Sequence, residues 1–538
     1  MTARQWHARN VELYRAQLRG DKGRAQWWDR IVLTAADAEQ ASVFEQQIEQ
    51  RKRLGTLPRH VVFDVIADPP DDGKVGNGGA TLLALSHLRT VLGSAWTSAR
   101  VILLHAGGYS KRLPHVSVLG KIFTSMPIES NWSMLELKLV MFGALPSRMT
   151  AGGVFVACAD DIEVFDSEDA GIDLSLPGVI ALAHPSSCNV GESHGVFSFT
   201  RGGDLLTQGQ RASMAPVRRF IHKPSTAEQI KEGCVVQPDV VFTDSTFFMD
   251  SPTCVKLLGV LDSDIKDARI PGEVDAYADF LVALTSETAL STNHEPASTL
   301  EGARAAIKRS LSGTPLTAAV LPHSMYVLNV FFFLLLTCFC RFYHIGTLAE
   351  YLFHLCADES FVSCLGVERA SDAALAAYVE QGGIAMHCRP SEPAATISRG
   401  AVIEYSLLGG GVCVPSGSVY SCVDLAAFAA PPPTETPFFA MCVFVVRNGV
   451  SCVVPVVFPA DMDVKVVSAR LNGPLWDAQL FPVCATVREA SAAMAGVMQW
   501  WLSTAPPPAA GVSLKDCIEG KDVDAALEFG YRGGQGRL

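Results

Sequence analysis

Glycines and basic residues follow a short apolar run in VILLHAGGYSKRLPHVSVLGK, from Val101 to Lys121. Gly107 and Gly108 let backbone N–H groups approach a phosphate without a Cβ in the way. Balancing positive charge is available from Lys111, Arg112 and Lys121. The ATPase loop GxxxxGK[ST] does not match, because Ile122 occupies the position of its magnesium-binding hydroxyl. We therefore predict a phosphate-binding loop here, in preference to a basic surface turn.

A second glycine cluster lies in GKVGNGGATLLAL, from Gly73 to Leu85. This pattern is typical of a loop that leads into a helix, where free N–H groups favour anions. It makes Gly76, Gly78 and Gly79 candidates for nucleotide binding. Glycine turns before helices are common, and the pattern does not distinguish a base contact from a phosphate contact.

Paired carboxylates follow a third apolar run, GGVFVACADDIEVF, which brings Asp160 and Asp161 to its carboxyl end. Open α/β sheets bind ligands at that edge. Magnesium is held there by one or two acids together with substrate phosphates. A solvated turn or helix cap is the alternative. The position at a strand end favours a metal site.

The elements that position these residues indicate an α/β fold. From Val61 onwards, short β-rich runs separated by Gly and Pro alternate with amphipathic stretches. Residues 1–58 are rich in Gln, Arg, Glu and Ala and predict a helical N-terminal element. Beyond Ile384 the chain is β-branched and turn-rich, which predicts either a few coils of β-helix or an antiparallel sheet.

The predicted domain order is a helical element (1–58), a Rossmann-like catalytic domain (59–350), a connecting helical segment (351–383), a β-rich domain (384–500) and a tail (501–538). A chain of 538 residues is long enough for two or three such units. The apolar stretch Val327–Cys340 falls short of the roughly 20 residues of a membrane helix, so we interpret residues 326–340 as an insertion or a buried strand.

Composition narrows the function and the compartment. A net charge of −12 argues against nonspecific nucleic-acid binding. The 15 cysteines are scattered and never spaced CxxC, which favours a reducing compartment. No apolar run follows the basic N-terminus as in a secretory signal. We expect a cytoplasmic protein that is not attached to a membrane.

Many motifs in a fixed order identify a family. HAGGYSKRLP, LGKIF, MLELKL, CADDIE, HPSS, HGVF, HKPS, FTDS, VDAYADFL and YHIGTLAEYLF together resemble the fucose-1-phosphate guanylyltransferases, also called GDP-L-fucose pyrophosphorylases. The resemblance continues through VIEYSLLGGGV, LWDAQLFPV and LKDCIEGKDVDAAL and covers most of the chain. No second Gly-rich ATP loop follows Ile384, so the chain resembles the form without a fused fucokinase.

The resemblance implies an enzyme that makes GDP-L-fucose and pyrophosphate from GTP and L-fucose 1-phosphate. It implies that Gly107, Gly108 and Arg112 contact the nucleotide phosphates, and that Lys121 contacts the reacting ones. Lys223 of HKPS is implied for the sugar phosphate, and Asp161 or Asp160 with Asp275 for Mg²⁺. Two alternatives remain at this stage: an idle nucleotide-sugar-binding regulatory subunit, and a transferase for another sugar 1-phosphate.

Overall fold

The computed structural model describes residues 3–20, 26–70, 73–129, 132–165, 171–200, 205, 211–285, 297–321, 341–370, 373–428, 436–506 and 511–531. The chain divides into two compact units. Unit 1 contains residues 1–107 and 136–342, and unit 2 contains residues 108–135 and 343–538. The predicted apolar insertion at 326–340 lies outside the described residues.

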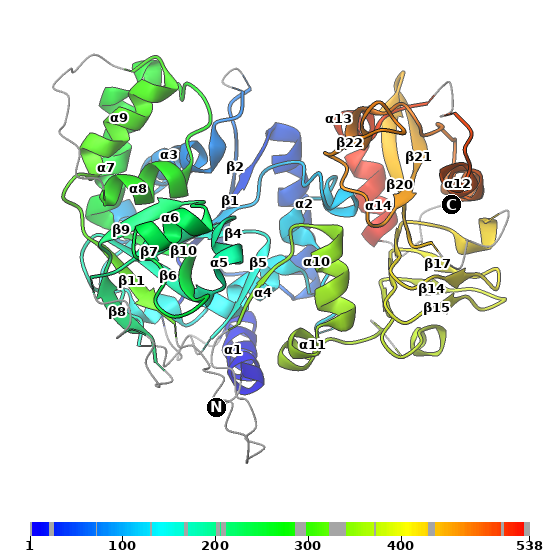
Figure 1. Ribbon diagram of the computed structural model, residues 1–538, viewed down its shortest axis with the longest axis horizontal. Coiled ribbons are helices and arrows are strands. Elements are labelled where there is room, and N and C mark those ends of the chain that lie inside the picture. The colour runs from blue at the N-terminus through cyan, green and yellow to red at the C-terminus, as the bar shows by residue number, and fades with distance from the viewer. Residues whose placement is uncertain are drawn as a thin grey trace. The chain divides into compact units, whose positions relative to one another are not determined.

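Unit 1 is built on a mixed sheet whose main path runs β2-β1-β3-β4-β10-β6-β11-β8. Its strands are β2 (Val62–Ala67), β1 (Arg30–Ala35), β3 (Arg100–His105), β4 (Gly153–Cys158), β10 (Val241–Asp250), β6 (Val179–Ser186), β11 (Leu316–Val320) and β8 (Ser213–Pro216). β7 (Gly195–Ser198) pairs with β10 and with β9 (Arg219–His222). Figure 1 shows these strands in blue to green.

The parallel half of this sheet contains a topological switch point. β1 pairs in parallel with β2 on one side and with β3 on the other, so consecutive connections leave in opposite directions. β3 pairs in parallel with β4, and β10 runs antiparallel between β4 and β6. Ligands of open α/β sheets bind at the carboxyl ends of the strands beside such a switch.

Local sequence signals start and stop the unit 1 helices. α2 (Ala38–Leu54) begins where the Asp37 side chain accepts from Gln40 N, and it ends at Gly55 in the left-handed region. α3 (Gly76–Leu92) buries Leu82, Leu85 and Leu88 in the main core. The other main helices are α4 (Met134–Phe142), α7 (Ser251–Gly259) and α9 (Leu300–Leu311).

The predicted N-terminal element, residues 1–58, contains more than helix. It comprises α1 (Ala3–Leu18), β1 and α2, and β1 lies inside the sheet between β2 and β3. The six residues of β1, RIVLTA, are a run too short to stand out beside the long polar helices on either side. The prediction of a purely helical segment was wrong for this strand.

Unit 2 contains three coils of a parallel β-helix, the first of the two architectures that the sequence left open. β13 (Ile384–Met386), β16 (Val402–Glu404) and β19 (Val419–Ser421) pair in parallel, with partners 17 or 18 residues apart. Two shorter ladders form the other faces: β14 (Arg389–Pro390) with β17 (Leu407–Leu408), and β15 (Thr396–Ile397) with β18 (Cys413–Val414). Figure 1 shows them in yellow.

A long hairpin extends the first face of the β-helix. β20 (Phe438–Arg447) pairs in parallel with β19 and antiparallel with β21 (Val450–Pro459). α12 (Val487–Leu502) packs on β21. The predicted tail contains α13 (Leu514–Glu519) and α14 (Val523–Tyr531). The ring centre of Phe529 in α14 lies 5.3 Å from that of Phe444 in β20. The predicted α/β class with a β-rich C-terminal domain is confirmed.

The N-terminal part of unit 2 includes α10 (Leu348–Leu352) and α11 (Glu359–Leu365). It also includes residues 108–135, which the sequence assigned to the catalytic domain. None of the described helices has the length and apolar character needed to cross a membrane.

Candidate active site

The glycine after β3 is required by a close approach of two strand ends. A Cβ on Gly107 would lie 2.9 Å from the carbonyl carbon of Ala35, where β1 ends. The hydroxyl of Thr34 accepts from Ala106 N at 3.2 Å and from Gly107 N at 3.5 Å. The predicted phosphate loop therefore starts at the switch point, between the carboxyl ends of β1 and β3.

The glycines of α3 hold the helix start against the segment that carries Asp275. Gly76 has φ +74°, and a Cβ there would lie 2.3 Å from the Val274 carbonyl oxygen. Gly78 N donates to that oxygen at 2.8 Å, and Ala276 N donates to Asn77 Oδ1 at 2.8 Å. Packing alone excludes side chains at Gly76 and Gly78, and the contact brings the α3 N-terminus beside Asp275.

Asp275 presents one bound and one open carboxylate oxygen. It caps the π-helix η8 (Ala276–Leu281), with Oδ1 accepting from Tyr277 N at 2.8 Å and Ala278 N at 2.9 Å. Within the described part of the chain, Oδ2 accepts no hydrogen bond. Burial lowers the pKa of His105 and raises that of Asp244, and the charge of Asp275 opposes the first shift and adds to the second, so these three side chains share one electrostatic environment.

His105, at the end of β3, is a site residue that the motifs did not indicate. Its Nε2 lies 2.9 Å from the Thr81 hydroxyl of α3, and its buried Nδ1 has no hydrogen-bond partner among the described residues. Burial lowers the pKa of His105 to about 4, with Asp275 opposing the shift. The ring is therefore neutral at pH 7 and can offer an uncharged nitrogen to a ligand.

Asp161 and Asp160 differ sharply in their surroundings. Asp161, the first residue of β5 (Asp161–Val164), is 3% exposed and forms a buried ion pair with Lys138 of α4. Burial raises the pKa of Asp161 to about 6, and Lys138 opposes that shift. Asp160 is only half-buried. Lys138, within the MLELKL motif, neutralises the second aspartate of the pair.

Lys223 follows β9 in a left-handed backbone conformation, with φ +49°. Its N–H donates to the His194 carbonyl at 2.9 Å, and its exposed side chain makes no ion pair with the described residues. Lys223 lowers the pKa of the buried Asp244, although burial as the larger effect raises that pKa to about 7. The ammonium group of Lys223 is thus exposed near Asp244 and His222.

The predicted cations of the phosphate loop belong to unit 2. The Arg112 side chain is exposed, and its carbonyl accepts from Leu348 N at 3.2 Å. Lys111 Nζ lies 4.4 Å from the ring centre of Trp476, a cation–π contact. Lys121 begins the 3-10 turn η3 (Lys121–Phe123) directly after Gly120, which has φ +90°.

The structure therefore gathers the predicted residues in two sets. Unit 1 holds Gly76, Gly78, Gly79, Gly107, Asp160, Asp161, Lys223 and Asp275, and unit 2 holds Gly108, Lys111, Arg112 and Lys121. The described residues contain no group of three or more His, Cys, Asp or Glu side chains able to hold a metal ion. The predicted magnesium role of the aspartates stays a prediction.

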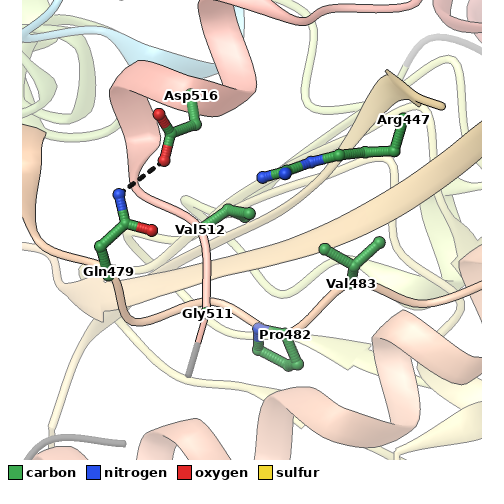
Figure 2. Close-up of a pocket in the computed structure, with 7 residues that line it drawn as sticks. All are labelled: Arg447, Gln479, Pro482, Val483, Gly511, Val512 and Asp516. Carbon is green, nitrogen blue, oxygen red and sulfur yellow. Dashed lines mark hydrogen bonds between the residues drawn. The ribbon is translucent and has the colours of Figure 1, made fainter. Parts of the chain in front are cut away.

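A pocket elsewhere in unit 2 has a different character. It is lined by Arg447, Gln479, Pro482, Val483, Gly511, Val512 and Asp516 (Figure 2). Gln479 donates to Asp516 at 2.7 Å, and the same carboxylate takes part in the capping box of α13. None of the predicted site residues lines this pocket, and the carboxylate of Asp516 is already held by these hydrogen bonds.

Comparisons with known proteins agree with the motif order. Residues 93–473 match the model of the fucose pyrophosphorylase domain. The chain is 32% identical to the fucose-1-phosphate guanylyltransferase of Mus musculus, over 96% of this chain and 94% of that protein. The Homo sapiens protein of the same name is 33% identical over 88% and 84% of the two chains. The bifunctional fucokinase/GDP-fucose pyrophosphorylase of Arabidopsis thaliana is 25% identical over 41% of this chain and 23% of its own length.

Proposed function

The chain belongs to the fucose pyrophosphorylase family and is a nucleotidyltransferase, and on that premise we propose that it transfers GMP from GTP to β-L-fucose 1-phosphate. The products are GDP-L-fucose and pyrophosphate, as expected for a salvage step in nucleotide-sugar metabolism. The observation that carries the proposal is the position of Gly107 at the switch point, with the α3 N-terminus and Asp275 held together beside His105.

The proposed reaction needs no base and no covalent intermediate. An oxygen of the sugar phosphate, already anionic at neutral pH, forms a bond to the α-phosphorus of GTP. The bond from that phosphorus to the bridging oxygen breaks, and pyrophosphate leaves with the electron pair. Positioning and charge stabilisation can supply the rate. The low pKa of His105 agrees with this scheme, because a neutral imidazole at pH 7 serves as a binding group.

The glycines and basic residues of the candidate site have different proposed roles. We assign the nucleotide to Lys111 and to the glycine segments that contain Gly76, Gly78, Gly79, Gly107 and Gly108, where backbone N–H groups and an ammonium group suit phosphates. The N–H of Gly78 already donates to the Val274 carbonyl, so Gly78 contributes through the close packing of the helix start. Arg112 and Lys121 stabilise the charge that develops on the transferred group. Lys223 binds the phosphate of the sugar, since its exposed ammonium makes no ion pair with the described residues.

The acidic residues fit a magnesium ion. Magnesium takes one or two protein carboxylates and fills its other positions with water and substrate phosphates. Asp275 offers the open oxygen Oδ2, and Asp160 offers a half-buried carboxylate. Asp161 is the weaker candidate because Lys138 already neutralises it. A bound magnesium ion would reduce the repulsion between the phosphates and the attacking anion.

A pyrophosphate-release assay tests the proposed substrates. GTP, ATP and UTP are each combined with fucose, mannose and glucose 1-phosphates in the presence of magnesium. We expect the fastest release with GTP and β-L-fucose 1-phosphate. Equal or faster release with UTP and glucose 1-phosphate would contradict the fucose assignment. Binding of GDP-fucose without turnover at any magnesium concentration would instead favour a regulatory subunit.

The same assay tests the metal ligands. Asp275→Asn preserves the shape but removes the charge of the open oxygen, so it should raise the magnesium concentration that gives half-maximal rate by about ten-fold. Asp262→Asn is the control, because Asp262 pairs with Arg89 on the surface of unit 1. An unchanged magnesium response in Asp275→Asn would remove Asp275 from the metal site.

A further inference from the structure

The segment that carries Arg112 and Lys121 is anchored by the C-terminal half of the chain. The Arg112 carbonyl is bound by Leu348 N, and the Pro127 carbonyl is bound by Glu368 N at 2.6 Å. Between these points the ring centre of His115 lies 4.9 Å from that of Tyr351 and 6.0 Å from that of Phe439. Residues 108–135, which carry the cations of the phosphate loop, therefore form part of unit 2 by packing, although they follow β3 of unit 1 in sequence.

The turn that begins with Lys121 is tied down on its carboxyl side. Phe123 N donates to the Gly120 carbonyl, and Thr124 donates to the Lys121 carbonyl through its N–H and, at 2.6 Å, through its hydroxyl. Ile122 and Phe123 are buried. Ser125, which follows Thr124, is 2% exposed, and its hydroxyl shares a hydrogen bond with the hydroxyl of Tyr405.

Tyr405 occupies an unusual backbone position in the β-helix. It forms the corner after β16 and has φ +50°, a left-handed conformation that is uncommon for a bulky side chain. The corresponding corners of the neighbouring coils are His387, with φ +52°, and Cys422, with φ +58°. The rings of His387 and Tyr405 are stacked, with centres 4.9 Å apart and planes at 10°. Such conformations persist where the surrounding structure enforces them and recur at functional sites.

We propose that Tyr405 is a positioning residue for the nucleotidyl transfer: through Ser125 it fixes the turn that presents Lys121. The proposal rests on the proposed function for the role of Lys121, but the hydrogen-bond link itself does not. Stacking on His387 orients the Tyr405 ring, and the Tyr405 hydroxyl then holds the Ser125 hydroxyl through their hydrogen bond. Ser125 lies four residues after Lys121, so this bond restrains the turn. The β-helix thus contributes to catalysis through the turn that begins with Lys121.

The test removes the hydrogen bond between the Ser125 and Tyr405 hydroxyls and keeps the stacked rings of His387 and Tyr405. Tyr405→Phe, Ser125→Ala and the double variant are compared with Tyr420→Phe. The hydroxyl of Tyr420 is buried in the next coil and has no hydrogen-bond partner in the part of the chain that the structure describes. We expect Tyr405→Phe and Ser125→Ala each to lower kcat about five-fold, as for loss of one hydrogen bond, and to leave the KM for GTP within two-fold. The double variant should lose no more than either single variant, because both remove the same bond.

Two readouts separate this inference from the proposed function. Wild-type-like kcat in Tyr405→Phe, in an enzyme that turns over, would overturn the positioning role and leave the reaction intact. If the wild type shows no turnover, hydrogen exchange decides. Amides of Gly120, Phe123 and Thr124, all hydrogen-bonded in the turn, should exchange about five-fold faster in Tyr405→Phe than in Tyr420→Phe. Equal exchange in the two variants would overturn the proposal.

Discussion

Burial decides how the ionisable residues of this molecule behave more than residue type does. Asp161 and Asp275 are both acids of the candidate site, yet one is locked in a buried ion pair and the other keeps an open oxygen. The motif CADDIE could not distinguish Asp160 from Asp161, because the partner Lys138 comes from a helix 23 residues upstream. His105 escaped notice for the same reason, since its contact with Thr81 depends on the packing of α3 on β3.

Replacement of Arg112 tests the assignment of the phosphate-loop cations. Arg112→Ala removes an exposed guanidinium and keeps the Arg112 carbonyl that accepts from Leu348 N of α10. We expect kcat to fall about 100-fold, or about 3 kcal/mol in barrier height, as is typical for loss of a preorganised charge-stabilising group. Steady-state kinetics with GTP and fucose 1-phosphate measure it. Arg488→Ala, on the exposed first turn of α12, is the control and should match the wild type.

Glu404 gives a prediction about pH and stability. It is 2% exposed and accepts from the Ser421 hydroxyl at 2.9 Å, and burial raises its pKa from 4.5 to about 7. The folded state therefore binds this proton more tightly than the unfolded state. Its stabilising effect is complete below about pH 4.5 and is lost as the pH rises through about 7.

Glu404→Gln should remove this dependence, because glutamine stays neutral and can still accept from Ser421. The variant should be more stable than the wild type at pH 8, by up to about 3 kcal/mol, with little difference at pH 4.5. Thermal unfolding across this pH range measures the change in Tm. Glu519→Gln, an exposed residue at the end of α13, should show no such trend. A constant Tm difference between Glu404→Gln and the wild type would contradict the prediction.

At the scale of elements, the spacing of three glycines marks the coils of the β-helix more clearly than the irregular apolar pattern does. Gly382, Gly400 and Gly417 form one corner column of the β-helix, with φ of +97°, +80° and +76°. Their spacing of 18 and 17 residues is present in the sequence, as RGAVIEYS and SGSVYSC show. The first coil, GGIAMHC, matches the others only in its glycine and apolar positions. Pairing partners were needed to distinguish these coils from an antiparallel sheet.

The packing of α3 on the Asp275 segment predicts a strong effect at Gly76. Gly76→Ala places a Cβ 2.3 Å from the Val274 carbonyl oxygen at a position with φ +74°. We expect a loss of about 2 kcal/mol in stability and weaker GTP binding, because the helix start must move away from Asp275. Thermal unfolding and nucleotide titration measure the two effects.

Gly259→Ala is the matched control for Gly76→Ala. Gly259 ends α7 with helical φ and ψ, and beyond its own helix no atom of the described residues lies within 4 Å of the Cβ position. Alanine there should be neutral or slightly stabilising, by about 0.5 kcal/mol. Equal stability of the two variants would mean that α3 accommodates a side chain at Gly76 without strain.

At the scale of the whole molecule, the two units are not consecutive in sequence. The sequence predicted a catalytic domain at 59–350 because its motifs lie there in order. Residues 108–135 nevertheless pack with residues 343–538, so the chain enters unit 2, returns to unit 1 and then enters unit 2 again. Motif order cannot reveal this arrangement, since it depends on which buried side chains meet after folding.

This interleaving predicts that the motif-bearing half does not fold alone. A chain ending at residue 342 keeps every candidate site residue but removes the partners of residues 108–135 within unit 2, among them Tyr351 and Phe439 around His115. Leu113, Ile122, Phe123 and Trp132, each at most 5% exposed in the full chain, belong to that segment. Apolar side chains left without their partners promote association. We expect the shortened chain to be insoluble or aggregated, as judged by size-exclusion chromatography.

A chain ending at residue 531 is the control, because it keeps every described helix and strand and should behave as the full-length protein. Recovery of the 1–342 chain as a monomer that unfolds cooperatively and binds GTP would contradict the prediction, because residues 108–135 would then be stable without unit 2.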